Sequence, residues 1–191
     1  IINEHNSVRK NAGLFDVSHM GEFFISGEGA ERFVQLVTIN DVSRLSVGKA
    51  QYTAMCDYNG GIIDDVILYK LNKGYMMVVN SANIKKDFEW LNSNIIEDVK
   101  LDNQSDEIGL ISIQGPKSRI ILQKLINMDI SDLSFYHFIE DIEISGYNAL
   151  LSRTGYTGEL GFEIYVLLES IEPLWEKLID VGKLDGLVPA G

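Results

Sequence analysis

The stretch QYTAMCDYNGGIIDDVILYKLNKGYMMVV, residues 51–79, contains three apolar runs separated by two turn signals. The turn signals are DYNGGII and NKG, which hold the asparagine and glycine residues that tight turns between strands prefer. Strands joined by such short turns pair antiparallel. The stretch therefore predicts an antiparallel sheet, and a third turn signal, SGYN at 145–148, predicts a further hairpin later in the chain.

Four segments of the chain have the pattern of a short apolar strand followed by a turn and an amphipathic helix. They are residues 22–37, 75–95, 108–126 and 162–182. We expect Ser81 to be the N-cap of the second helix, and Pro116 to lie in the first turn of the third, where proline is tolerated. Helices that cover one face of antiparallel sheets define an α+β fold, and the pattern does not fit a doubly wound parallel sheet.

The charge balance argues against nucleic acids and anionic membranes as partners. The 191 residues include 28 acidic and 16 basic side chains, which gives a net charge of −12 at pH 7. Nucleic acids and anionic membranes are both bound through clustered Lys and Arg, so we expect neither as a partner. With 46% hydrophobic residues, the chain is long enough for a substantial core in one large domain or two small ones.

Cysteine and histidine are too few and too scattered to define a metal site. The one cysteine, Cys56, excludes an internal disulfide and a multi-thiolate site, and the three histidines show no metal-ligand spacing. No apolar run approaches the length of about 20 residues that crosses a bilayer, and the first residues lack the apolar core of a secretion signal. We therefore expect no metal, and a location in a bacterial cytoplasm or an organelle matrix.

Two adjacent carboxylates, Asp64 and Asp65, interrupt an otherwise apolar strand. Successive side chains of a strand point to opposite faces, so Asp64 shares a face with Val66 and Leu68, and Asp65 cannot join it in a dyad. Two interpretations remain. Either both aspartates are solvated at a strand end just after a turn, or one points into a pocket while the other holds the turn through backbone amides.

The segment RTGYTGELGFEIYV, residues 153–166, has three glycines within seven residues and then a strand, a pattern that lets a ligand approach the backbone closely. A phosphate-binding loop fits poorly, because such loops open a helix and Arg153 is the only nearby cation. Tyr156 and Glu163 suit a planar heterocycle better, since a carboxylate accepts two parallel N–H bonds from a guanidine-like edge while a tyrosine lies against the ring. An ordinary hairpin with strained turns is the alternative.

Two further places have polar side chains beside apolar strands. Asn80, in VVNSAN, either caps the following helix or turn, or directs its amide toward a ligand at the end of the strand. Ser18 and His19, in FDVSHMG, look triad-like but have no nucleophile elbow or acidic partner that spacing identifies. Neither place defines a reaction by itself.

Five motifs, taken in their order and spacing, resemble the aminomethyltransferases (T-proteins) of the glycine cleavage system. They are GLFDVSHMGEF, NGGIIDDVI, VVNSAN, IQGP and TGYTGELGFEIYV, and the resemblance extends along all 191 residues. A match of five linked motifs is specific. Members of this family have a segment before the first motif and continue beyond PAG at 189–191, so we expect the chain to be a fragment.

The resemblance implies a tetrahydrofolate-dependent transferase. Its reaction moves the one-carbon unit from an aminomethyl group on the lipoyl arm of the H-protein to tetrahydrofolate, which gives 5,10-methylenetetrahydrofolate, ammonia and the reduced lipoyl arm. The lipoylated H-protein is the implied partner, and we expect a monomer. The fragment alone is not necessarily active.

The functional residues of the family carry over to matching positions of this sequence. Asp64 matches the essential aspartate at the reactive nitrogens of the folate, where a carboxylate takes or orients a proton and stabilises an iminium-like carbon. Asp65 is left with a structural role. The folate-binding residues that the resemblance implies are Tyr52, Val79, Asn80, Tyr156 and Glu163, of which the last two match the pterin-binding pair.

The fold of the family implies two interleaved α+β folate-binding modules, mostly antiparallel with helices on one face, and a C-terminal barrel-like module that is absent from this chain. The first module is expected to combine residues 1–18 and 108–191, and the second to span residues 19–107.

Three alternatives stay open. Some relatives of this fold accept methyl groups from sulfonium or tertiary-amine compounds or are fused to sarcosine-oxidising enzymes, which would make the chain part of a folate-dependent demethylase. A second class serves iron–sulfur assembly, but its members usually show a cysteine-containing motif near the loop where this chain has GYTGELGFE. A non-catalytic folate-binding protein is the third alternative.

Overall fold

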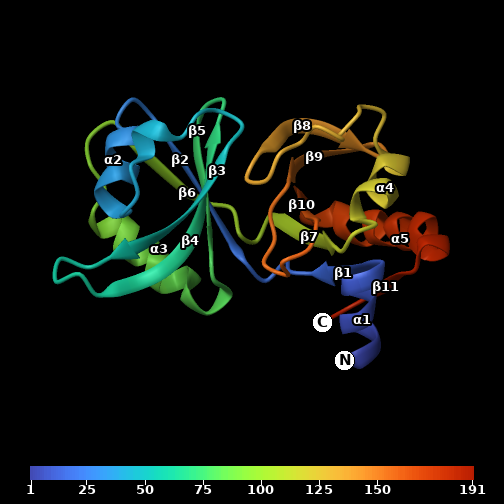
Figure 1. Ribbon diagram of the computed structural model, residues 1–191. Coiled ribbons are helices and arrows are strands. Elements are labelled where there is room, and N and C mark those ends of the chain that lie inside the picture. The colour runs from blue at the N-terminus through green and yellow to red at the C-terminus, as the bar shows by residue number, and fades with distance from the viewer. The chain divides into compact units, whose positions relative to one another are not determined.

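The computed structural model describes all 191 residues, which divide into two compact units. The first unit combines residues 1–18 with 107–191, and the second spans residues 19–106. The pairing of the strand β1 (Ala12–Asp16) explains the division, because its neighbour is β7 (Ile108–Gln114) and not the strand that follows it in the sequence. Residues 19–106 form a sheet of their own (Figure 1).

The 19–106 unit is a five-stranded antiparallel sheet in the order β3-β4-β5-β2-β6. Its strands are β2 (Gly21–Ser26), β3 (Ala50–Cys56), β4 (Ile62–Leu71), β5 (Gly74–Val79) and β6 (Lys100–Asn103), and its helices are α2 (Ala30–Val37) and α3 (Ile84–Ser93). Both helices pack on one face of the sheet, as Figure 1 shows. The two hairpins predicted from the turn signals, β3–β4 and β4–β5, are confirmed.

The core of this unit follows from the alternation of side chains along its strands. Phe23 and Ile25 of β2 and Leu68 of β4 face the helices, where they pack with Phe33 and Leu91. All five side chains are 0–1% exposed. Burial of such a side chain contributes about 1.5–3 kcal/mol, so this apolar face is what holds α2 and α3 on the sheet.

The other unit has a six-stranded mixed sheet in the order β11-β1-β7-β10-β9-β8. Besides β1 and β7 it contains β8 (Phe138–Ile144), β9 (Tyr147–Ser152), β10 (Gly161–Leu167) and β11 (Leu187–Pro189), with the helices α1 (Ile2–Lys10), α4 (Ser118–Leu122) and α5 (Ile171–Gly182). The β1–β11 pair is parallel, and the sequence did not predict it because a three-residue strand has no periodicity to recognise. The predicted α+β class is confirmed, as two sheets of which one is mixed and one antiparallel.

Two predicted helix starts are wrong by a few residues. α3 begins only after a 3-10 turn over residues 81–83, so Asn83 and not Ser81 is its N-cap. α4 begins at Ser118, because a backbone turn that contains Pro116 comes first. The longest helix, α5, has 12 residues, and no helix combines the length and the apolar character that a membrane span needs.

Gly74 fixes the turn between β4 and β5. Its φ is +95°, and a Cβ there would lie 2.2 Å from the carbonyl oxygen of Ile25 in the neighbouring strand β2. We expect Gly74→Ala to lower the free energy of unfolding by about 2–4 kcal/mol, because left-handed strain and a clash with backbone act together. Urea unfolding followed by tryptophan fluorescence measures this loss.

Gly146→Ala is the matched control. Gly146 is also a hairpin glycine, at φ +90°, but nothing lies within 4 Å of the added Cβ. The control should lose only the strain contribution, about 1–2 kcal/mol. Equal losses for the two variants would contradict the role assigned to the Ile25 carbonyl.

Candidate functional site

A β-bulge lies directly before Asp64 in β4. The register of β3 against β4 shifts just after the Met55–Asp64 pair, so that Ile63 has no partner of its own. A bulge bends the strand and re-aims the neighbouring side chains. Asp64 is only 5% exposed, and it shares the helix-covered face with Leu68, whereas Asp65 is exposed. The interpretation in which both aspartates are solvated is therefore wrong.

Three amide donors hold the Asp64 carboxylate. The Asn83 side chain donates to Oδ1 at 2.7 Å, and the Asn80 side chain donates to the same oxygen at 3.0 Å. The backbone N–H of Asn80 donates to Oδ2 at 3.2 Å. All three donors come from the turn between β5 and α3, and none of them is charged, so they orient the carboxylate without neutralising it.

The pKa of Asp64 lies below its ordinary value. Burial alone would raise this pKa, but hydrogen bonds to the carboxylate from Asp87, Asn80 and Asn83 outweigh burial and lower it. Asp64 is therefore anionic at neutral pH. Asp87 on α3 behaves in the opposite way, because burial and then the interaction with Asp64 raise its pKa to about 8.

Asp65 does not hold the β3–β4 turn, in contrast to the sequence-based interpretation. The carboxylate of Asp57 holds it, by accepting two backbone N–H groups of the turn at 2.8 and 2.9 Å. Asp65 instead accepts a hydrogen bond from the Tyr52 hydroxyl at 2.9 Å, on the opposite face of the sheet from Asp64. Tyr52 is 55% exposed, so its ring is accessible from solvent.

Val79 and Asn80 contribute to the end of β5 in different ways. The Asn80 amide donates to Asp64 and, at 3.0 Å, to the backbone carbonyl of Asp65, and it makes no helix cap. Val79 is 0% exposed, and its side chain belongs to the apolar cluster beneath the helices. Val79 therefore offers no exposed surface to a ligand.

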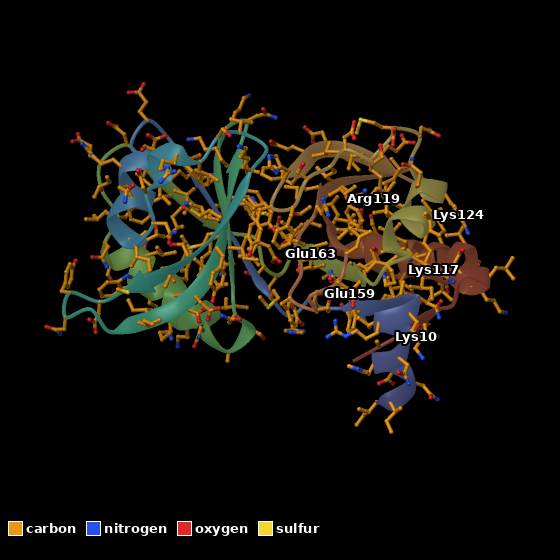
Figure 2. The ribbon with its side chains drawn as sticks, viewed as in Figure 1. Lys10, Lys117, Arg119, Lys124, Glu159 and Glu163 are labelled. Carbon is orange, nitrogen blue, oxygen red and sulfur yellow. The ribbon has the colours of Figure 1, made fainter.

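In the unit formed by residues 1–18 and 107–191, Glu163 lies among hydroxyl groups. It is on β10, is 6% exposed, and lies between Ser112 of β7 and Ser152 of β9 (Figure 2). The Thr154 hydroxyl donates to the Glu163 carboxylate and lies 3.0 Å from the Ser152 hydroxyl. Burial and then the charge of Glu163 raise the pKa of Tyr136, which places that phenol near the carboxylate.

Gln114 explains two of the three glycines in the 153–161 loop. Its side-chain amide donates to the Thr154 carbonyl at 3.2 Å and accepts from the Thr157 hydroxyl at 2.9 Å. A Cβ at Gly155 or Gly161 would lie 2.3 or 2.0 Å from Gln114 Oε1. These glycines make room for a buried glutamine, so close approach of a ligand is not needed to explain them.

Tyr156 lies apart from this hydroxyl cluster. Its side chain is 84% exposed and lines a cavity of about 380 Å³ together with His5 and Arg9 of α1 and Phe15 of β1. Glu163 does not line that cavity. This cavity therefore contains only one member of the pair that the sequence pattern suggested.

Sequence reasoning missed Asn83 and Asp87. Asn83 lies in the VVNSAN motif, but no local pattern indicates that its side chain contacts Asp64. Asp87 follows Ile84 by three residues and precedes Leu91 by four, so it falls on the apolar stripe of α3. A carboxyl group on the buried stripe of an amphipathic helix is the signal that could have identified it.

The two polar clusters can do different chemistry. Asp64 is a buried anion held by neutral donors, so it can accept a proton or stabilise a cation. Glu163 is a carboxylate beside hydroxyl groups, and a carboxylate pairs well with two parallel N–H donors. No group of three or more His, Cys, Asp or Glu side chains is arranged to hold a metal ion.

The fold and these residues agree with one family. The chain matches the family model described as the GCVT N-terminal domain over residues 1–191, and it belongs to that family. An aminomethyltransferase from Geobacillus sp. (strain WCH70) is 51% identical over 189 residues, which are 98% of this chain and 52% of that protein. An aminomethyltransferase from Natranaerobius thermophilus is 51% identical over 192 residues, covering 100% of this chain and 53% of that protein. The chain thus spans about half the length of the curated relatives it matches.

Solved structures support the same fold. The crystal structure of glycine cleavage system aminomethyltransferase T from Bartonella henselae matches with a TM-score of 0.87 and 30% identity, over 98% of this chain and 50% of that chain. Heterotetrameric sarcosine oxidase from Corynebacterium sp. U-96 matches with a TM-score of 0.67 at 15% identity, over 96% of this chain and 89% of that chain, and shares the fold alone.

Two carboxyl groups of the 19–106 unit make its stability depend on pH. Burial raises the pKa of Glu22 to about 8, and the pKa of Asp87 is raised to about 8 as well. In an unfolded chain these two carboxyl groups lose their protons at about pH 4. Between about pH 4 and 8 the folded state therefore binds more protons, and the free energy of unfolding falls as the pH rises. Glu22→Gln should reduce this slope in urea unfolding at about pH 5 to 8.

Glu28→Gln is the control for this prediction, because Glu28 is an exposed carboxylate in the same unit. It should leave the pH slope unchanged. If Glu22→Gln has the slope of the unsubstituted protein, then Glu22 does not hold a proton in the folded state.

Proposed function

We propose that the protein carrying this chain is a tetrahydrofolate-dependent aminomethyltransferase of the glycine cleavage system. It transfers the one-carbon unit from the aminomethyl-lipoyl group of the H-protein to tetrahydrofolate and releases ammonia. The family membership and the identity of about half to aminomethyltransferases support this proposal. The observation that carries it is the anionic, buried Asp64 carboxylate, held by three amide donors.

The reaction requires two protons to leave the folate. The transferred carbon ends bonded to two folate nitrogens, each of which loses its N–H proton, while the donor loses its carbon–nitrogen and carbon–sulfur bonds. One proton leaves with ammonia and the other with the lipoyl thiol. A carboxylate beside these nitrogens can accept or orient one of the protons, and its negative charge stabilises the cationic iminium-like carbon during the transfer.

Asp64 is suited to this role because its charge is intact. A carboxylate paired with Lys or Arg would already have its charge compensated, but the three donors closest to Asp64 are amides. Lys86 is the nearest lysine on α3, and its ammonium group donates to the backbone carbonyl of Ile63 at 2.6 Å instead. Asn80 holds the carboxylate in place through its side-chain amide and its backbone N–H.

Glu163 is proposed to bind the guanidine-like edge of the pterin. Its carboxylate lies on β10 among hydroxyl groups, with Thr154 as a donor, and the two oxygens of a carboxylate match two parallel N–H donors. We assign Tyr156, whose ring is largely exposed, to a stacking contact with the folate, and Tyr52 to a more peripheral contact.

Asp64→Asn in the full-length protein tests the catalytic assignment. The amide keeps the shape of the side chain but removes the charge, so kcat for ammonia release from the aminomethylated H-protein should fall by about 10²- to 10⁴-fold. Affinity for tetrahydrofolate should change much less. Asp65→Asn, on the neighbouring residue and the opposite face, should have a far smaller effect on kcat. An Asp64→Asn enzyme with unchanged kcat would show that another group does the chemistry.

Glu163→Gln tests the pterin assignment. Loss of charge-assisted hydrogen bonds should weaken binding of 5-formyltetrahydrofolate, a stable analogue, by about tenfold or more in a calorimetric titration. Glu159→Gln is the control, because Glu159 lies in the preceding loop and pairs with Arg9 at 2.9 Å (Figure 2). If both variants bind the analogue equally well, the pterin contacts a different part of the protein.

A further inference from the structure

Asp87 is a buried carboxyl group that has no hydrogen-bond donor and only one cation, Lys86, near it. It is 0% exposed, and neither of its oxygens accepts a hydrogen bond from a protein donor. The closest cation is Lys86, with 3.9 Å between its Nζ and Oδ1 of Asp87, too far for a hydrogen bond. A buried carboxylate in this situation is strongly unfavourable, so the group must carry its own proton.

The position of Asp87 on α3 directs it toward Asp64. Asp87 follows Asn83 by four residues, and side chains four residues apart lie on the same face of a helix. Helical side chains also point back toward the helix N-terminus, which here is the end where Asn83 donates to Asp64 at 2.7 Å. Asp87 thus lies behind the amide donors, on the side of the carboxylate that the helix covers.

We propose that Asp87 is a positioning residue for Asp64: it carries a proton at neutral pH and donates a hydrogen bond to the Asp64 carboxylate, which it keeps anionic and correctly oriented. This inference rests on the proposed function, in which Asp64 is the reacting carboxylate. Asp87 itself touches neither the folate nor the aminomethyl group.

The location of the proton follows from the surroundings of the two carboxyl groups. Ionisation of one carboxyl group disfavours ionisation of a second that interacts with it in a buried site, so a single proton on the pair is favoured. Asp64 has three amide donors that favour its anionic form, and Asp87 has none. The proton therefore stays on Asp87, in agreement with the raised pKa of Asp87 and the lowered pKa of Asp64.

The proposal makes catalysis depend on pH through a group that does not react. The charged groups that act on Asp87 are Asp64, from β4, and Lys86, on its own helix. Glu22, on β2, belongs to the opposite face of that strand from Phe23, which contacts Phe88 of α3. Above about pH 8 Asp87 loses its proton, and two adjacent negative charges then repel each other and disturb the Asp64 carboxylate.

Two substitutions in the full-length protein separate the role of Asp87 as a hydrogen-bond donor from its loss of a proton near pH 8. Asp87→Asn keeps an N–H donor of similar size but cannot ionise, so kcat at pH 7 should stay close to that of the unsubstituted enzyme while the loss of activity near pH 8 disappears. Asp87→Leu removes the donor, so kcat should fall by about tenfold or more with little change in the KM for tetrahydrofolate. Glu89→Gln removes an exposed carboxylate of the same helix and should leave both properties unchanged.

Carbon-13 NMR of aspartate carboxyl groups provides a readout that does not depend on activity. In the unsubstituted protein, one buried carboxyl should titrate near pH 8, and the pKa of Asp64 should be lower than that of an ordinary aspartate. Asp87→Asn should remove the titration near pH 8. An Asp87 that titrates at an ordinary aspartate pKa would overturn the inference. So would an Asp87→Leu protein that is folded by circular dichroism and fully active.

The two proposals fail in different ways. If Asp64→Asn keeps full activity while the NMR titration still shows the raised pKa of Asp87, the hydrogen-bonded pair stands and the catalytic assignment of Asp64 is wrong. If Asp64→Asn is inactive but Asp87→Asn retains the alkaline loss of activity, the function stands and Asp87 is not the residue that controls the pH profile.

Discussion

The negative charge of Asp64, buried beneath a helix, is the constraint on which the arrangement of the 19–106 unit depends. An unpaired buried carboxylate is unfavourable by several kcal/mol, so the fold must surround it with donors. Two departures from regular structure do this. The bulge at Ile63 ends the regular pairing of β3 and β4 directly before Asp64, and the 3-10 turn over residues 81–83 delays the start of α3 so that Asn80 and Asn83 reach the carboxylate.

Both units hold a carboxylate that accepts hydrogen bonds from neutral donors. Asp64 is held by amides, and Glu163 accepts a hydrogen bond from the hydroxyl of Thr154. Basic side chains near these sites are engaged elsewhere: Lys86 donates to a backbone carbonyl, and Arg153 donates to the backbone carbonyl of Leu133. A carboxylate held by neutral amide donors keeps its negative charge for a cationic intermediate, so the surroundings of Asp64 agree with the proposed chemistry.

The sequence predicted those features that depend on local signals. The hairpins came from glycine and asparagine in turns, and the strand–helix units came from the spacing of apolar residues. The pairing of β1 with β11 and the partnership of Asp64 with Asp87 join residues far apart in the sequence, and no local pattern specifies them. The glycines of the 153–161 loop show a related difficulty. Their number suggested a ligand, but the close neighbour of two of them is Gln114, which lies on a different strand.

The discontinuous unit also determines the order in which the chain can fold during synthesis. β1 ends at Asp16, but its two neighbours end at Gln114 and Pro189. The sheet of residues 19–106 contains all of its own strands, so it can be complete when β1 has gained no partner. Until the last strand leaves the ribosome, β1 presents unpaired backbone N–H and C=O groups of the kind that promote wrong pairings. Among the strands of this chain, the first to be made is therefore the one that depends longest on protection by chaperones.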